Sequence, residues 1–453
     1  MGDPDDTGRA GLRHLEVAKR LAVNGTVRVT GHRLQDRAMA APPPKPFAIR
    51  ALNAGGAALG AAGLRVPSLD PQALCRRAVR ATGLDDFGGD EFREPLGRLV
   101  SSLEDDAQLT TLGRVIAARE ISGLLENRLR LTDVRRRHPE IADETVRAPV
   151  FILGLPRTGT SILHELVAQD PSVRTPLTWE VARPFPPPAP DSYESDARIG
   201  ELDRHYAGID RIIPDFKSMH RMGAQLPQEC VAITQHEFAS MVWHTTHEVP
   251  SYQQWLESAD LTFAYRGHRR WLEYYQWAVP RDRWILKSPG HLWALESLLA
   301  VYPDAYIVQT HRDPLKVVAS LVSLMCTLRS MASDSIDAHA IGRDWAARLA
   351  DGLDRTTRVR ESGAIAAERV VDVHFAEFLD DEVATVRGIY ERVGLEMSAD
   401  AEHRMRRYLG ENSADQHGRH RYTLAAAGLD LETERQRFAD YQERYSVPSE
   451  KME

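Results

Sequence analysis

The sequence predicts an α/β protein whose P-loop-like core has a parallel sheet flanked by helices, preceded by a mainly helical N-terminal region. Three observations predict this class. Short apolar runs alternate with helix-period segments after residue 145, a glycine-punctuated loop follows the first run, and residues 1–145 show helical periodicity without clear strands. Unbroken apolar runs are typical of strands that are buried on both faces of a parallel sheet. We therefore expect a helical region over residues 1–145 and an α/β domain over residues 146–453.

Each short apolar run of the second region is expected to form a strand. These runs cover residues 150–153, 284–286, 305–309 and 369–373. Helices are expected between and after them, over residues 161–168, 291–301, 314–331 and 380–393. In the first region the periodicity predicts helices over residues 71–82 and 91–131. The Gly- and Ala-rich residues 53–64 fit either a close-packed helix or a mobile segment.

The composition excludes several classes of protein. The chain has 453 residues, 43% of them hydrophobic, so it can bury a large core. A net charge of −8 argues against a general nucleic-acid binder. The three cysteines lie far apart, which predicts neither a disulfide framework nor a zinc site. No signal peptide or membrane span is apparent, so a cytoplasmic location is expected. The sequence does not decide the oligomeric state.

The loop after the first predicted strand has the composition of a phosphate-binding turn. Gly154 to Ser161 has the spacing of a Walker A loop, but Thr160 stands where that motif has its lysine. Backbone amides of such a loop, together with the positive end of the following helix, hold a phosphate. The loss of the lysine and the presence of Arg157 indicate a nucleotide with a shorter phosphate chain than a triphosphate.

Two further polar motifs also follow predicted strands directly. Lys287-Ser288-Pro289 comes after the second strand, and residues 311–314 (HRDP) come after the third. Ligands of a parallel sheet bind at the carboxyl ends of its strands. We therefore expect the three motifs to lie at one edge of the sheet.

The motifs LPRTGTS (residues 155–161) and THRDPLKVVASLVSL (residues 310–324) resemble those of sulfotransferases that use 3′-phosphoadenosine 5′-phosphosulfate (PAPS). The chain is most similar to the bacterial branch that shares features with tyrosylprotein sulfotransferases, over about residues 148–445. The resemblance implies an enzyme that moves a sulfuryl group from PAPS, without a metal, to a hydroxyl of a small-molecule, lipid or glycan acceptor. The first 145 residues match no motif.

The resemblance also implies where the donor binds. The 5′-phosphosulfate is expected on the glycine loop, at Arg157, Thr158, Gly159, Thr160 and Ser161. The 3′-phosphate is expected on a strand-end arginine, a serine in the next helix and a C-terminal basic loop, which correspond to Arg312, Ser320, Arg419 and Arg421.

Lys287 is the expected catalytic cation, assisted by Arg157, because negative charge builds on the leaving phosphate oxygen during the transfer. The acceptor hydroxyl also needs a base. Glu180 is the leading candidate, since a carboxylate beside Trp179 in a partly apolar cleft suits general-base work, although it lies two residues later than in the related branch. His291 is a second candidate, and the remaining rivals are His164 and Glu165.

A metal site and two other functions have less support in the sequence. The best-spaced histidine pairs, His244 with His247 and His417 with His420, have no carboxylate or cysteine partner at ligand spacing, so we expect no metal site. A P-loop kinase or NTPase is the first alternative, and the replacement of the Walker lysine by Thr160 counts against it. An inactive nucleotide-binding scaffold is the second alternative.

Overall fold

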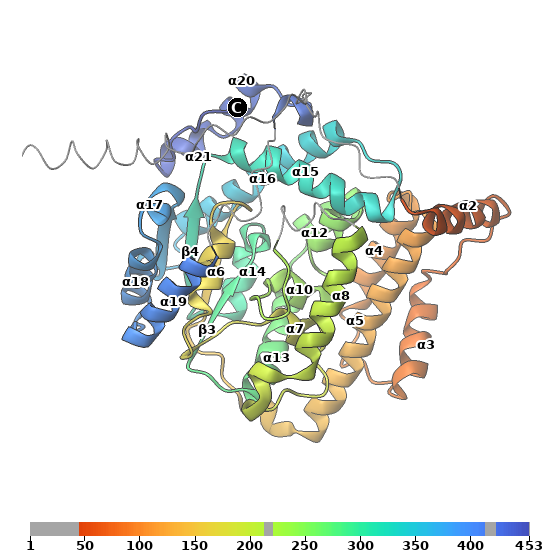
Figure 1. The fold of residues 1–453 in the computed structure, drawn as a ribbon, viewed down its shortest axis with the longest axis horizontal. Helices are drawn as coiled ribbons and strands as arrows, with labels where there is room; N and C mark the ends of the chain where they lie inside the picture. The colour runs from red at the N-terminus through yellow and green to blue at the C-terminus, as the bar shows by residue number, and fades with distance from the viewer. Residues whose placement is uncertain (1–44, 213–220, 413–422, 453) are drawn as a thin grey trace, which may run out of the picture. The chain divides into compact units, whose positions relative to one another are not determined.

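A parallel five-stranded sheet lies at the centre of the part of the chain that the computed structural model describes, residues 45–212, 221–412 and 423–452 (Figure 1). The strand order is β2-β3-β1-β4-β5. The strands are β1 (Val150–Gly154), β2 (Val173–Arg174), β3 (Arg283–Lys287), β4 (Tyr306–His311) and β5 (Val370–His374). All described residues belong to one compact unit.

The central position of β1 explains its sequence. All five of its residues are buried, and the strand pairs with β3 on one side and β4 on the other. Val150 lies opposite Ile285 and Tyr306 in the two ladders. A strand that is covered on both faces and both edges has no position that favours a polar side chain.

Helices cover both faces of the sheet. On one face α6 (Thr160–Val167), α18 (Glu382–Val393) and α19 (Ala399–Glu411) enclose an apolar core with the strand residues. On the other face the Phe151 ring packs 5.2 Å from the Tyr302 ring and edge-on to His291. This second face is covered by α13 (Thr262–Ala278) and the short helix η4 (Pro289–Leu292).

The helices before the sheet begin and end at residues that suit those positions. Asp70 caps α3 (Pro71–Thr82) by accepting the Ala73 amide, and Gly83 closes it in the left-handed conformation. Thr110 caps α5 (Thr111–Arg137) in the same way. The α5 helix packs against α3, α13 and α15, so this region is continuous with the core. The other helices here are α2 (Phe47–Ala61), α4 (Arg93–Asp105) and η1 (Pro139–Asp143).

The remaining helices lie between and after the strands. Between β2 and β3 these are α7 (Thr178–Ala182), η2 (Pro190–Ser195), α8 (Ala197–Ile212), α10 (Cys230–Thr234), η3 (Gln235–Glu237), α11 (Val242–Thr246) and α12 (Pro250–Ser258). Later in the chain they are α14 (Leu295–Val301), α15 (Pro314–Ala332), α16 (Ala338–Glu361), η5 (Ala367–Arg369), α17 (Phe375–Asp380), η6 (Ala425–Ala427), α20 (Leu431–Arg437) and α21 (Ala439–Arg444). No described helix combines the length and the apolar composition that crossing a membrane requires.

The predicted fold class is confirmed, and each of the four predicted strands is present. The two-residue strand β2 was not predicted, because so short a pairing leaves no run in the sequence. The prediction of one continuous helix over residues 91–131 is wrong, because residues 106–110 separate α4 from α5. The predicted helix over residues 291–301 is likewise divided into η4 and α14. The division at residue 145 stays a prediction.

Candidate active site

The glycine loop has the backbone that a phosphate cradle needs. Gly154 has φ 145°, and a Cβ there would lie 2.2 Å from Thr310 Oγ1, so only glycine fits beside β4. Gly159 precedes α6 with φ 86°, and Arg157 also adopts the left-handed conformation with φ 66°. The exposed Arg157 thus stands at the turn, and the amides of the first α6 turn lie at the loop.

The hydroxyl groups of the loop have two different roles. Thr158 is buried, and its Oγ1 donates to the Leu155 carbonyl at 2.6 Å and lies 2.6 Å from Thr310 Oγ1. This hydroxyl braces the loop against β4, so a ligand contact at Thr158 would use its backbone amide. Ser161 is exposed in the first turn of α6, whereas Thr160 is buried. Of the three hydroxyls, the one on Ser161 is the best placed for a ligand.

Lys287 ends β3 next to this loop, and its ammonium is almost completely buried. The Lys287 Nζ donates to Ser161 Oγ at 3.1 Å and to the carboxylate of Glu229. Two of its three N–H donors are thereby engaged among the described residues. Burial, and to a smaller extent the charge of Lys287, lowers the pKa of the neighbouring His164 to about 3. His164 is therefore neutral near pH 7 and adds no second positive charge beside Lys287.

Glu229 was not predicted as a site residue. It precedes α10, and the preceding segment is held to the residues after β2 by the Gln228 amide, which donates to the Pro176 carbonyl at 2.7 Å, and by a bridge between Leu177 and Pro227. The Glu229 side chain is partly exposed and lies beside the only ammonium of the described site. Since 58 residues separate Glu229 from Lys287, only the fold brings the two together.

Glu180 lies in a different environment from the one expected. Its carboxylate is fully buried and accepts two hydrogen bonds from the Arg174 guanidinium, at 2.9 and 2.7 Å, and one from the Leu177 amide. The Arg174 guanidinium also donates to Tyr193 Oη at 2.7 Å and stacks on the Trp284 ring. The Glu180 carboxylate is thus engaged by Arg174 and the Leu177 amide, and among the described residues it makes no contact with Lys287. This geometry indicates a structural ion pair.

The other candidate bases are also engaged elsewhere. His291 is buried, with its Nδ1 2.7 Å from Tyr265 Oη, and burial holds the pKa of His291 well below its ordinary value. Glu165 accepts from Arg221 at 3.0 Å and from Tyr408 Oη at 2.6 Å. Among the described residues, neither side chain contacts Lys287.

Arg312 lies on the opposite side of the loop. Its Nη1 donates to the Arg157 carbonyl at 2.8 Å, and its guanidinium lies 4.1 Å above the Phe375 ring centre. Its Nε and Nη2 bind the Glu450 carboxylate at 2.7 and 3.0 Å. The predicted arginine is thus brought to the loop, together with a carboxylate from the C-terminal segment that the sequence did not indicate.

The neighbouring Asp313 fixes the start of α15. Its Oδ1 accepts the Leu315 amide at 3.0 Å and its Oδ2 accepts the Glu450 amide at 2.7 Å. Ser320 is half-exposed two turns further along α15. The predicted Arg419 and Arg421 lie outside the described residues.

Comparisons with known proteins agree with this arrangement. A sequence model described as "Sulfotransferase family" matches residues 149–399, more than half of the chain. The chain belongs to the sulfotransferase family.

Individual relatives extend the similarity beyond the matched region. Crystal structures of sulfotransferase STF1 from Mycobacterium tuberculosis (32% identity, TM-score 0.73) and STF9 from Mycobacterium avium (28% identity, TM-score 0.77) cover 82% and 84% of this chain, and 98% of each of theirs. Omega-hydroxy-beta-dihydromenaquinone-9 sulfotransferase Stf3 of Mycobacterium bovis and of Mycobacterium tuberculosis is 24% identical over 293 residues, or 60% of this chain and 69% of that protein. The predicted family and the prediction of an enzyme are confirmed.

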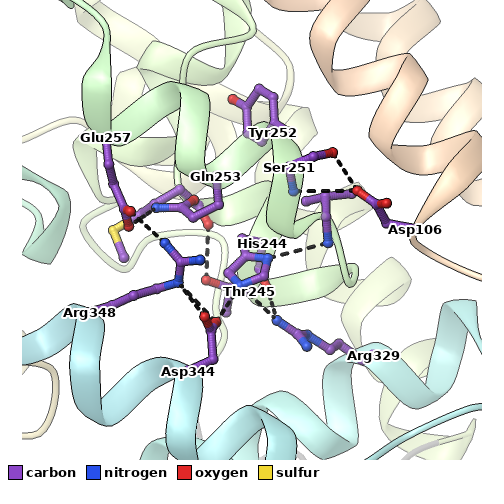
Figure 2. Close-up of polar contacts among 12 residues, drawn as sticks. Asp106, His244, Thr245, Ser251, Tyr252, Gln253, Glu257, Arg329, Asp344 and Arg348 are labelled. Carbon is purple, nitrogen blue, oxygen red and sulfur yellow. Dashed lines mark hydrogen bonds and ion pairs between the residues drawn. The ribbon is translucent and has the colours of Figure 1, made fainter.

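The candidate metal-binding histidine has another role in this sulfotransferase. Figure 2 shows His244 within a network of polar side chains from α11, α12, α15 and α16. Its Nε2 lies 2.9 Å from Asp344, its Nδ1 accepts the Val249 amide, and its carbonyl accepts from Arg329 at 2.6 Å. Burial lowers the pKa of His244 to about 4. Within the described ranges no group of three or more metal-ligating side chains occurs, and the pair His417 and His420 lies outside them.

One cavity lined by described residues lies away from this chemistry. It has a volume of about 770 Å³ and extends along the second half of α6 and β2. Glu165, Arg174, Arg221 and Tyr408 are among its lining residues, whereas Ser161, Lys287 and Arg312 are not. Its size therefore does not make it the catalytic site.

We expect Glu180→Ala to destabilise the protein by about 3–5 kcal/mol, because it leaves the Arg174 guanidinium buried without its partner. Thermal or denaturant unfolding measures the loss. Glu201→Ala is the matched control: it breaks the exposed Arg183–Glu201 pair, which should cost at most about 1 kcal/mol. Full stability of Glu180→Ala together with lost turnover would instead identify Glu180 as the base.

Proposed function

We propose that this sulfotransferase uses PAPS as its donor and moves the sulfuryl group to a hydroxyl of a lipid or similar apolar small molecule. The observation that carries the proposal is the position of the Lys287 ammonium, which contacts Ser161 of the glycine loop and the carboxylate of Glu229. One buried cation thus joins the expected donor cradle to a potential proton acceptor. The similarity to Stf3, named for a hydroxylated menaquinone, supports a lipid acceptor for this chain.

The described residues fit the two ends of such a donor. The turn of the loop from Gly154 to Gly159 brings the first amides of α6 to the loop, next to Lys287, and such amides bind anions. Arg312 lies across the same loop, joined to it through the Arg157 carbonyl, and two of its five N–H donors are not engaged by described residues. An anion on the loop and a second phosphate on Arg312 would therefore be neighbours. The family membership also argues against the kinase alternative.

The residues have separate roles in the transfer. The donor supplies an activated sulfuryl group. As the sulfur–oxygen bond to its phosphate breaks and a new one forms to the acceptor oxygen, Lys287 stabilises the charge on the leaving phosphate oxygen. Glu229 takes the proton of the acceptor hydroxyl. Ser161 holds the ammonium of Lys287 at the loop, and Arg312 binds the 3′-phosphate.

We expect calorimetric titration without added metal to show tighter binding of 3′,5′-diphosphoadenosine than of ATP. Arg312→Ala should weaken diphosphoadenosine by about 10- to 100-fold, because charge-assisted hydrogen bonds are lost, and should leave the 3′-dephospho nucleotide nearly unchanged. Glu450→Gln is the control, since it breaks the same ion pair but keeps the guanidinium. Equal weakening of both nucleotides would contradict the role of Arg312, and a preference for ATP would contradict the donor.

Lys287→Met keeps most of the side-chain volume but removes the charge. We expect turnover to fall by about 100-fold or more while diphosphoadenosine still binds, because the charge acts chiefly on the transition state. Single-turnover transfer of labelled sulfate from PAPS and calorimetry measure the two effects. Unchanged turnover would show that another group supplies the cation.

For Glu229→Gln, turnover with an aliphatic alcohol should fall by about 100-fold or more, the usual contribution of a general base. The loss should be much smaller with an acidic phenol, whose proton leaves without help. Glu180→Gln provides the comparison, since its carboxylate is held by Arg174. If the loss is the same for both acceptors, Glu229 acts on binding or on Lys287 and not as the base.

A further inference from the structure

Exposed apolar side chains are concentrated in one short part of the described chain. Five of the seven large apolar side chains that are strongly exposed lie within residues 47–66, which we call the α2 arm: Phe47, Leu52, Leu59, Leu64 and Val66. The other two, Leu379 and Leu431, lie apart from the arm and from each other in the sequence. A contiguous exposed apolar segment of this kind marks an interaction surface.

The α2 helix has no buried residue, although it is largely apolar. Figure 1 shows it extending outward from the N-terminal end of α5. Leu52 and Leu59, two turns apart, share one side of the helix. A helix that is apolar on nearly every side is ordinarily buried, so its exposure indicates a missing partner.

The arm is attached to the enzyme at defined points. Asn53 Oδ1 accepts the Leu112 amide at 3.0 Å, and α2 passes so close to α5 that a Cβ at Gly56 would overlap the Thr111 side chain. Just before the arm Lys45 pairs with Asp334, and near its end Arg65 pairs with Glu104, at 2.7 and 3.0 Å. These contacts hold the arm on the body while its leucines stay exposed.

The charge of the segment identifies the partner. Residues 41–69 contain no Asp or Glu, although the whole chain has 65 of them and a net charge of −8. Among the basic residues of this stretch, Lys45 and Arg65 are paired, and Arg50 stands exposed on α2. A cationic apolar helix without acidic residues suits the surface of an anionic bilayer, where apolar side chains enter the acyl boundary and basic side chains meet the headgroups.

We propose that the α2 arm docks the enzyme on an anionic membrane surface, with Leu52 and Leu59 in the lipid interface and Arg50 at the headgroups. The inference deepens the proposed function and rests in part on it, because a lipid acceptor is dissolved in a bilayer and must be reached there. The arm meets α5 where the Thr110 amide donates to the Ala332 carbonyl at the end of α15, the helix that begins beside Arg312. The docking surface is thus linked through α5 to the end of α15, and the other end of α15 lies beside the proposed donor site.

The test is cosedimentation of the full chain with vesicles of phosphatidylcholine, with and without phosphatidylglycerol. We expect binding to the anionic vesicles, at least a tenfold loss in Leu52→Asp/Leu59→Asp, and about a fivefold loss in Arg50→Gln. Leu379→Asp/Leu431→Asp is the matched control, because it places the same charges at equally exposed leucines outside the arm, and it should bind like the unchanged protein. Thermal melting confirms that each variant is folded.

Failure of this inference is distinguishable from failure of the proposed function, because vesicle binding requires no sulfuryl transfer. Transfer to a water-soluble alcohol without vesicle binding would overturn the docking role and leave the function standing. Equal loss in the arm and control variants would show that general charge, not the arm, governs binding. Concentration-dependent dimers that the arm substitutions abolish, without vesicle binding, would show that a second copy covers the arm.

Discussion

The architecture of the site depends on the burial of one ammonium group. An ion of this kind is removed from water only where nearby groups replace its hydration. Lys287 satisfies this condition through Ser161 and Glu229, which belong to different elements. Because β3 pairs with β1, the lysine at the end of β3 is placed next to the loop that follows β1. The parallel sheet therefore sets the distance between Lys287 and the glycine loop. Glu229, at the start of α10, contacts the ammonium as its second partner.

The second anion site that we propose, at Arg312, depends on a comparable neutralisation. Arg312 and Asp313 are adjacent, and both are held by the C-terminal segment: Glu450 binds the guanidinium through its carboxylate and Asp313 through its amide. Arg435 also donates to Asp313 at 2.8 Å. Residues more than 120 positions later in the sequence thereby fix the arginine against the loop. A phosphate bound to Arg312 would share the guanidinium with the Glu450 carboxylate, so the C-terminal segment would influence how strongly Arg312 binds that phosphate.

Much of this fold follows from local sequence. The strands β1, β3, β4 and β5 are short apolar runs, and the Asp313-Pro314 pair marks the start of α15 by the capping rules. The convergence of Lys287 and Arg312 at the glycine loop follows from the parallel order of the strands. The β2 strand escaped prediction because two residues carry no periodicity, and α2 was ambiguous because its exposed apolar residues do not form one buried face.

Glu180 and Glu229 show why the proposed base is harder to predict than the glycine loop. In the sequence, Trp179 beside Glu180 suggested an apolar cleft around this carboxylate. Burial alone, however, does not show whether a carboxylate is free to act as a base. The side chain of Arg174, six residues earlier, forms a buried ion pair with Glu180, so Glu180 is part of the core. Glu229 has no distinguishing neighbours, and its role arises from a contact with Lys287 that no local pattern encodes.

The pairing of Lys287 with Glu229 also bears on the order of events. In the described state the two charges compensate each other, so neither is left uncompensated beside the loop. An anion bound on the loop would compete with Glu229 for the Lys287 ammonium, because both would lie within hydrogen-bonding distance of this one group. Donor binding would then weaken the hold of Lys287 on Glu229, at the place where a hydroxyl proton must be accepted. A cation in this position therefore couples donor binding to the release of the Glu229 carboxylate, which can then accept a proton. A lysine paired with another residue would not provide this coupling.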